Sequence, residues 1–319
     1  TLGLTLLLFA TLFSCMRQEK PLPAELSRAE SVMWEHPDSA LSILRSMPQS
    51  SLSSGKNYAT WALLLAQARD KVYGKRLPDS LNIPSSDKLV QDAMDYFEKE
   101  GNLKRMAQTY YYKGQLLKDQ KKITEAMPFF LKSKEMMTKL DEPLFTYLIC
   151  QSLGNTYRYQ DLYEESLVQL KDAYQYALRS GNGERISYAL SELGRTYVHK
   201  NEMDSALFYF GKSLDNAQRL GNIELEAMAM GELGVVYNKL SQGEKALHYT
   251  RKELDLCLQI SSLHKLPQVY YKIGSAFWSL GQLDSAKVYF QKSLETDNLY
   301  TLNEAYEVLY YICVEQKLY

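Results

Sequence analysis

The chain has 319 residues, of which 45% are hydrophobic and 24% charged, a composition that excludes a disordered or membrane-embedded protein. Lysine and arginine number 37 against 38 aspartates and glutamates, for a formal net charge of −1. Direct DNA or RNA binding requires a basic surplus, so we expect no nucleic-acid contact by this part of the chain.

The first segment is apolar from Thr1 to Ser14 and is followed by Cys15 and a polar run. It is too short to span a bilayer, which takes about 20 apolar residues. An apolar stretch of this length before a small residue is typical of a secretory signal. We therefore predict a signal peptide over residues 1–14 and export from the cytoplasm.

The end of this segment, Leu12-Phe13-Ser14-Cys15, resembles the bacterial lipoprotein box, although Phe13 departs from the usual small or branched residue. The resemblance implies a lipid on Cys15, a tether over residues 15–23, and a periplasmic-side location in the cell envelope, anchored to a membrane. The alternative is an ordinary signal peptide, or an uncleaved anchor, with an incidental cysteine.

Two weaker helical units follow the tether. Residues 24–48 predict a short helix hairpin that caps the array, because its phrase Asp38-Ser39-Ala40 recurs at two later helix starts. Residues 57–100 predict a degenerate repeat whose turn, over 74–86, is enlarged by Gly, Pro, Asp and Ser.

From residue 103 onward the chain repeats itself at a fixed spacing of forty positions. One glycine marks each copy: Gly114, Gly154, Gly194, Gly234 and Gly274. A small residue stands twelve positions later, at Ala126, Ser166, Ala206, Ala246 and Ala286. Two antiparallel helices approach closely where their crossing carries little side chain, and we expect each glycine to face this small residue there. The pattern predicts stacked helix hairpins.

The order Leu-Gly, Tyr three positions on, Ala twelve on and Phe sixteen on resembles the tetratricopeptide repeat, whose usual length is about 34 residues. The resemblance implies an all-α fold, an α-α superhelix of antiparallel hairpins. Armadillo and HEAT repeats also reach about 40 residues but lack this crossing signature. The predicted repeats are 103–140, 143–180, 183–220, 223–260 and 263–299, followed by a truncated half repeat over 300–319.

Helix ends repeat as well. Gly101, Gly181 and Gly221 stand at one phase of the repeat, with Asp141 and Ser261 in the other copies, and glycine accepts the left-handed conformation that ends a helix. We expect turns of about five residues within each hairpin.

The last helix lacks a partner in this sequence. A first helix without its second leaves Leu302, Tyr306, Leu309, Tyr310 and Cys313 uncovered, and solenoids end in units with a polar outer side. We expect the native gene to continue beyond Tyr319 with at least one more amphipathic helix.

The sequence carries no recognisable catalytic or metal-binding pattern. Its four histidines are scattered without a second ligand at helical spacing, and no phosphate-binding loop or nucleophile motif is present. Cys150, Cys257 and Cys313 are expected to be small buried residues. We therefore expect no enzyme activity, no cofactor and no metal.

Function is then expected on the surface, where the resemblance implies that the first helices line a concave groove. Positions three before, one after and four after each glycine select its residues: Tyr111, Gln115, Lys118, Gln151, Asn155, Arg158, Ser191, Arg195, Asn238, Tyr271, Ser275 and Trp278. Amides can bond an extended peptide backbone, and aromatic rings and arginines anchor interfaces. We expect charge reversal at Arg158 and Arg195 to abolish binding of an acidic ligand and to leave stability nearly unchanged.

Family members that bind acidic chaperone tails clamp two carboxylates with paired Lys and Asn residues, and only Asn155 matches that pattern clearly. The chain resembles the sensor portion of bacterial regulators in which such an array precedes a membrane helix and a helix-turn-helix segment. We therefore expect a non-enzymatic protein- or peptide-binding scaffold, extracytoplasmic and sensory. The alternative is a stand-alone envelope lipoprotein that scaffolds a periplasmic complex.

Overall fold

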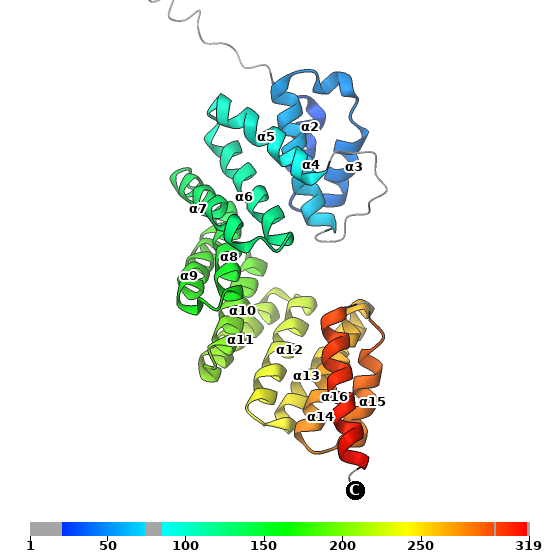
Figure 1. Ribbon diagram of the computed structural model, residues 1–319. Coiled ribbons are helices and arrows are strands. Elements are labelled where there is room, and N and C mark those ends of the chain that lie inside the picture. Colours follow the sequence, from blue (N-terminus) through cyan, green and yellow to red (C-terminus); the bar gives the residue numbers. More distant parts are fainter. Residues whose placement is uncertain (1–20, 74–84, 297, 318–319) are drawn as a thin grey trace, which may run out of the picture. The chain divides into compact units, whose positions relative to one another are not determined.

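The computed structural model describes residues 21–73, 85–296 and 298–317 (Figure 1). Every regular element in these ranges is a helix, which confirms the predicted all-α fold of stacked hairpins. None of the described helices is long and apolar enough to cross a membrane. Cys15 and the predicted signal peptide lie outside the described residues, so lipidation stays a prediction.

The chain divides into two compact units, residues 1–129 and 130–319, with the boundary inside helix α7. In unit 1 the helices are α2 (Ala24–Val32), α3 (Pro37–Ser46), α4 (Gly55–Tyr73), α5 (Ser86–Glu100), α6 (Leu103–Asp119) and the first part of α7 (Ile123–Lys139). A short 3-10 helix, Gln49–Leu52, precedes α4. The Trp61 indole on α4 donates a hydrogen bond to the Leu44 carbonyl on α3 at 2.8 Å, which joins these two helices.

Unit 2 is a row of hairpins (Figure 1). Its helices are α8 (Pro143–Tyr159), α9 (Tyr163–Ser180), α10 (Gly183–His199), α11 (Met203–Leu220), α12 (Ile223–Lys239), α13 (Gly243–Gln259), α14 (Leu266–Ser279), α15 (Leu283–Ser293) and α16 (Leu299–Lys317). Consecutive helices pack as pairs, and each first helix also contacts the next first helix, in the order α8, α10, α12, α14, α16. We call the surface of these five helices the first-helix face.

The joints between helices recur at every twentieth position. A residue with positive φ ends a helix at positions 101, 121, 141, 161, 181, 201, 221, 241, 261 and 281. At Asp161, for example, φ is 59°, and the next N–H, of Leu162, donates to the Tyr157 carbonyl at 3.0 Å. This hydrogen bond satisfies a carbonyl at the C-terminal end of α8, so the helix ends within one turn. The turn between α8 and α9 is therefore only residues 160–162, shorter than the five residues we predicted.

The hairpin crossing differs from our prediction in one respect. We expected each glycine to face the small residue twelve positions later, but a Cβ on Gly194 would lie 2.6 Å from the Phe210 ring, sixteen positions later. At Gly154 the neighbour is likewise the Leu170 side chain, at 2.5 Å. The small residue, Ser166 in that hairpin, is fully buried and contributes its carbonyl, at 3.3 Å. The glycine therefore makes room for a large side chain.

The last helix, α16, packs on α14 and α15 through Ala305, Val308 and Ile312. Of the five residues that we predicted on the uncovered face, Tyr306 and Tyr310 are 59% and 66% exposed. The other three, Leu302, Leu309 and Cys313, are partly buried. The continuation of the gene beyond Tyr319 stays a prediction.

The cysteines behave as predicted in two of three cases. Cys150 and Cys257 are buried, whereas Cys313 is partly exposed. Burial raises the pKa of the Cys150 thiol to about 12. A thiol held neutral in this way is a poor nucleophile.

Candidate functional site

The predicted groove residues of unit 1 lie on α6 and form hydrogen bonds with one another. The Gln115 amide donates to the Tyr111 hydroxyl at 2.9 Å, and the Lys118 ammonium donates to the Gln115 carbonyl at 2.5 Å. Tyr111 is only 5% exposed. Burial raises the pKa of the nearby Asp70 carboxyl, and the charge of Lys118 opposes that shift. These contacts hold the three side chains in place within unit 1.

Seven of the predicted residues are partly buried on the first-helix face of unit 2. They are Gln151, Asn155 and Arg158 on α8, Arg195 on α10, Asn238 on α12, and Tyr271 and Trp278 on α14. Ser275 is also on this face. Ser191 was wrongly placed there, because its hydroxyl is buried against the Ser213 hydroxyl at 2.9 Å, inside the hairpin.

The two arginines that we predicted to bind an acidic ligand are neutralised by carboxylates. Arg158 lies 2.7 Å from Glu192, Arg195 lies 2.7 Å from the same carboxylate, and Arg195 lies 2.6 Å from Glu232. Burial disfavours the charge of Arg195, but Glu232 and Glu192 outweigh burial and raise its pKa. We call this row Arg158–Glu192–Arg195–Glu232 the ion ladder; it joins α8, α10 and α12. Glu192 and Arg195 are an i,i+3 pair within α10. The sequence did not reveal the contacts between helices, because their partners are 34 and 37 residues apart.

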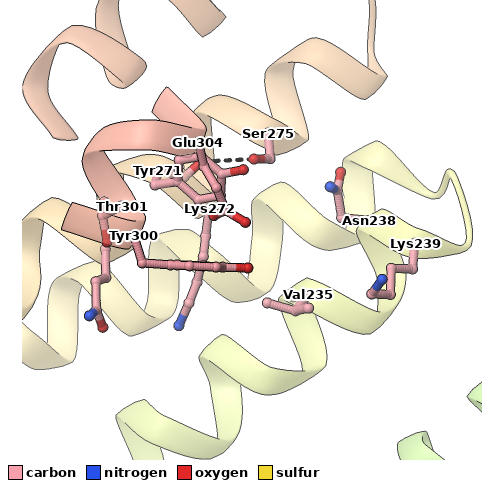
Figure 2. A pocket seen from close by; sticks show the side chains of 11 residues that line it. Val235, Asn238, Lys239, Tyr271, Lys272, Ser275, Tyr300, Thr301 and Glu304 are labelled. Carbon is pink, nitrogen blue, oxygen red and sulfur yellow. Dashed lines mark hydrogen bonds between the residues drawn. The ribbon is translucent and has the colours of Figure 1, made fainter. Parts of the chain in front are cut away.

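Beyond the ladder the first-helix face is hollowed between α12, α14 and α16 (Figure 2). This hollow has a volume of about 520 Å³ and is lined by Gly234, Val235, Asn238, Lys239, Gln268, Tyr271, Lys272, Ser275, Tyr300, Thr301 and Glu304. A smaller hollow of about 310 Å³ shares Asn238, Tyr271 and Ser275 and extends to Trp278 and Ser279. Together we call these two the anchor hollow. It is large enough for side chains of a bound peptide.

The polar groups of the anchor hollow are held by neighbours. The Asn238 carbonyl oxygen accepts a hydrogen bond from the Ser279 hydroxyl at 2.5 Å, which fixes the orientation of the amide. The Tyr271 ring packs edge-on against Phe290, with centroids 5.4 Å apart. Burial, together with the Glu304 carboxylate, raises the pKa of Tyr271 to about 12. Tyr271 is therefore a neutral phenol at physiological pH.

The sequence did not predict a buried ion pair next to the anchor hollow. The Lys272 ammonium lies 2.7 Å from the Glu253 carboxylate, and Glu253 is only 6% exposed. Burial raises the pKa of Glu253, and Lys272 opposes the shift. A side chain at Gly231 would collide with both partners. In the sequence, Gly231 was the available sign of this ion pair, because the other repeats carry a larger residue at the same position.

We found no metal-binding arrangement in the described part of the chain. No three His, Cys, Asp or Glu side chains there are grouped closely enough to hold a metal ion.

Comparison with known proteins supports the repeat assignment. The family model described as tetratricopeptide repeat matches residues 107–136 and 267–298. No curated protein sequence matches the chain. Among solved structures, the apo form of RapI superposes with a TM-score of 0.70 at 14% identity, covering 88% of this chain and 79% of that one.

Two further structures share the fold. NprR in complex with its cognate peptide NprX has a TM-score of 0.64 at 14% identity, covering 94% of this chain and 85% of that one. Aspartyl phosphate phosphatase F from Bacillus subtilis has a TM-score of 0.60 at 16% identity, covering 88% and 76%. At these identities the likeness establishes the fold alone.

Proposed function

Because the chain is a solenoid built of tetratricopeptide repeats, we propose that it is a non-enzymatic scaffold that binds a peptide or an extended protein segment at the anchor hollow. A row of first helices presents amide and aromatic side chains in one direction, which suits an extended backbone. The peptide complex of NprR supports this mode of binding by analogy.

The observation that carries the proposal is the contrast along the first-helix face. From α8 to α12 the two groove arginines, Arg158 and Arg195, are paired with carboxylates in the ion ladder. From α12 to α16 the face is hollowed, with the Trp278 and Tyr271 rings beside the fixed amide of Asn238. Deep aromatic pockets with a few placed polar groups carry most of the energy in peptide recognition.

The test is selection of binders from a displayed library of random 12-residue peptides on the purified protein. We expect Asn238→Ala and Trp278→Ala to weaken the selected peptides by at least about tenfold, since buried tryptophans are common hot spots. Phe208→Ala, on the outer side of α11 and 55% exposed, is the matched control and should bind as the wild type does. Equal loss in all three variants, or none in the first two, would contradict this site.

We also propose that the chain is lipid-anchored at Cys15 on the periplasmic side of a membrane, where it forms the sensory part of a signalling protein. The support is the apolar stretch of residues 1–14 before a lipoprotein-like box. Cys15→Ala should move the protein from the membrane to the soluble fraction, because the lipid supplies the apolar burial that holds it. Unchanged fractionation of the variant would count against lipidation.

A scaffold of an envelope complex is the second candidate, and one surface favours it. Val168, Phe208 and Val288 recur at multiples of forty positions on second helices and are 57%, 55% and 49% exposed. Contiguous exposed apolar patches mark interaction surfaces, and these three residues stand at the same position of their hairpins, although His248 interrupts the series. If a protein partner no longer binds Phe208→Ala but still binds Trp278→Ala, the envelope-complex scaffold is favoured over the peptide-binding function.

A further inference from the structure

The anchor hollow has a charge pattern that the rest of the first-helix face lacks. Elsewhere on unit 2 the buried carboxylates are paired with cations, since Glu192 and Glu232 lie in the ion ladder and Glu253 lies against Lys272. Glu304, on α16, has no Lys, Arg or His within ion-pair distance in the described ranges. It is partly buried and lines the hollow.

The neighbours of Glu304 are two phenols. Burial and Glu304 raise the pKa of Tyr271, and a hydrogen bond to Glu304 is the largest cause of the raised pKa of Tyr300. Both phenols therefore stay protonated, with the Glu304 carboxylate beside them. Figure 2 shows the three side chains on the α14 and α16 side of the hollow. A carboxylate beside two aromatic rings is the chemistry that attracts an ammonium or guanidinium group.

The two lysines of the hollow do not fill this place. The Lys272 ammonium is held by Glu253 at 2.7 Å, in the space left by Gly231. Lys239 lies across the hollow on α12, beside Val235 and Asn238 (Figure 2). A ligand can therefore place a cation at Glu304 and an oxygen, such as a peptide carbonyl, at Asn238 and Lys239.

We propose that the anchor hollow selects peptides with a basic side chain, whose cation binds Glu304 between the rings of Tyr271 and Tyr300. This inference rests on the proposed function, because it specifies which peptide the same hollow accepts. Arginine fits better than lysine, since its planar guanidinium can stack on a ring and still bond a carboxylate with two N–H groups. An acidic peptide is disfavoured there, because Glu304 would repel it.

The experiment uses three fluorescein-labelled peptide mixtures on the full chain. Each is seven residues long, random except for a central Arg, norleucine or Glu, and binding is measured by fluorescence anisotropy. We expect the Arg mixture to bind about tenfold more tightly than the norleucine mixture, and the Glu mixture to bind most weakly.

The variants separate this inference from the function on which it rests. Glu304→Gln should remove the preference for Arg while the norleucine mixture still binds. Glu307→Gln, an exposed carboxylate one turn along α16, is the matched control and should keep the preference. If the wild type binds all three mixtures equally, or if Glu304→Gln keeps the preference, the inference is overturned and the proposed function stands. If no mixture binds, both are overturned.

Discussion

Reversing the charges of Arg158 and Arg195 to Glu should destabilise unit 2 by about 3 kcal/mol, because it leaves Glu192 and Glu232 among like charges. The Arg158 and Glu192 side chains are only 16% and 10% exposed, so water screens their interaction weakly. Arg195 is 34% exposed, so its share is reduced by solvent screening. Urea unfolding followed by circular dichroism measures the change in the free energy of unfolding.

This expectation replaces the one drawn from sequence, in which both arginines stood on an exposed face and their reversal left the melting temperature nearly unchanged. The control is the fourfold charge swap, which adds Glu192→Arg and Glu232→Arg and restores opposite charges at every contact. It should recover much of the lost stability. A double variant as stable as the wild type would show that the ion ladder contributes little to folding.

Replacing Gly194 with Leu should cost about 3 kcal/mol, since even a Cβ at this position would lie 2.6 Å from the Phe210 ring. The rest of a leucine side chain has no space to enter, so α10 and α11 must separate. Helix propensity acts in the opposite direction but supplies only about 1 kcal/mol. The melting temperature and the urea midpoint should both fall.

A second glycine provides the matched control. Gly211 lies within α11, and a Cβ there would meet no atom within 4 Å. Gly211→Ala should therefore stabilise the protein by about 0.5–1 kcal/mol through lower backbone entropy in the unfolded state. In addition, Phe210→Ala should relieve part of the cost of Gly194→Ala, because the two residues share the same space. If the two substitutions change the free energy of unfolding additively, residues 194 and 210 are not in contact at the helix crossing.

The repeat architecture was predictable because it depends on local spacing. Glycines forty positions apart and small residues twelve positions later are visible in the sequence, and each reflects a steric need at a helix crossing. The neighbour of each glycine was not predictable, because that depends on the offset between paired helices. Phe210, rather than the expected Ala206, occupies the space beside Gly194.

The candidate site was predictable only as a face. Helical spacing places Asn238, Tyr271 and Trp278 on the correct side of their helices, and all three line the anchor hollow. Spacing gives no information on pairing between repeats, so Arg158 was predicted to bind an acidic ligand although Glu192 neutralises it. Glu304 was missed because it stands ten residues before Val314, the repeat position of α16, and so falls outside the three groove positions counted from each repeat glycine.

The left-handed joints, which stand at every twentieth position from 101 to 281, also limit how a gene for this protein can change. An insertion or deletion of a few codons inside a hairpin would shift the next joint away from its helix end, and the crossing glycine away from its partner. Loss or gain of forty codons keeps both in phase, and the reading frame as well. Unequal recombination between repeats is then a route by which ligand-binding hairpins can be exchanged without refolding the rest of the chain.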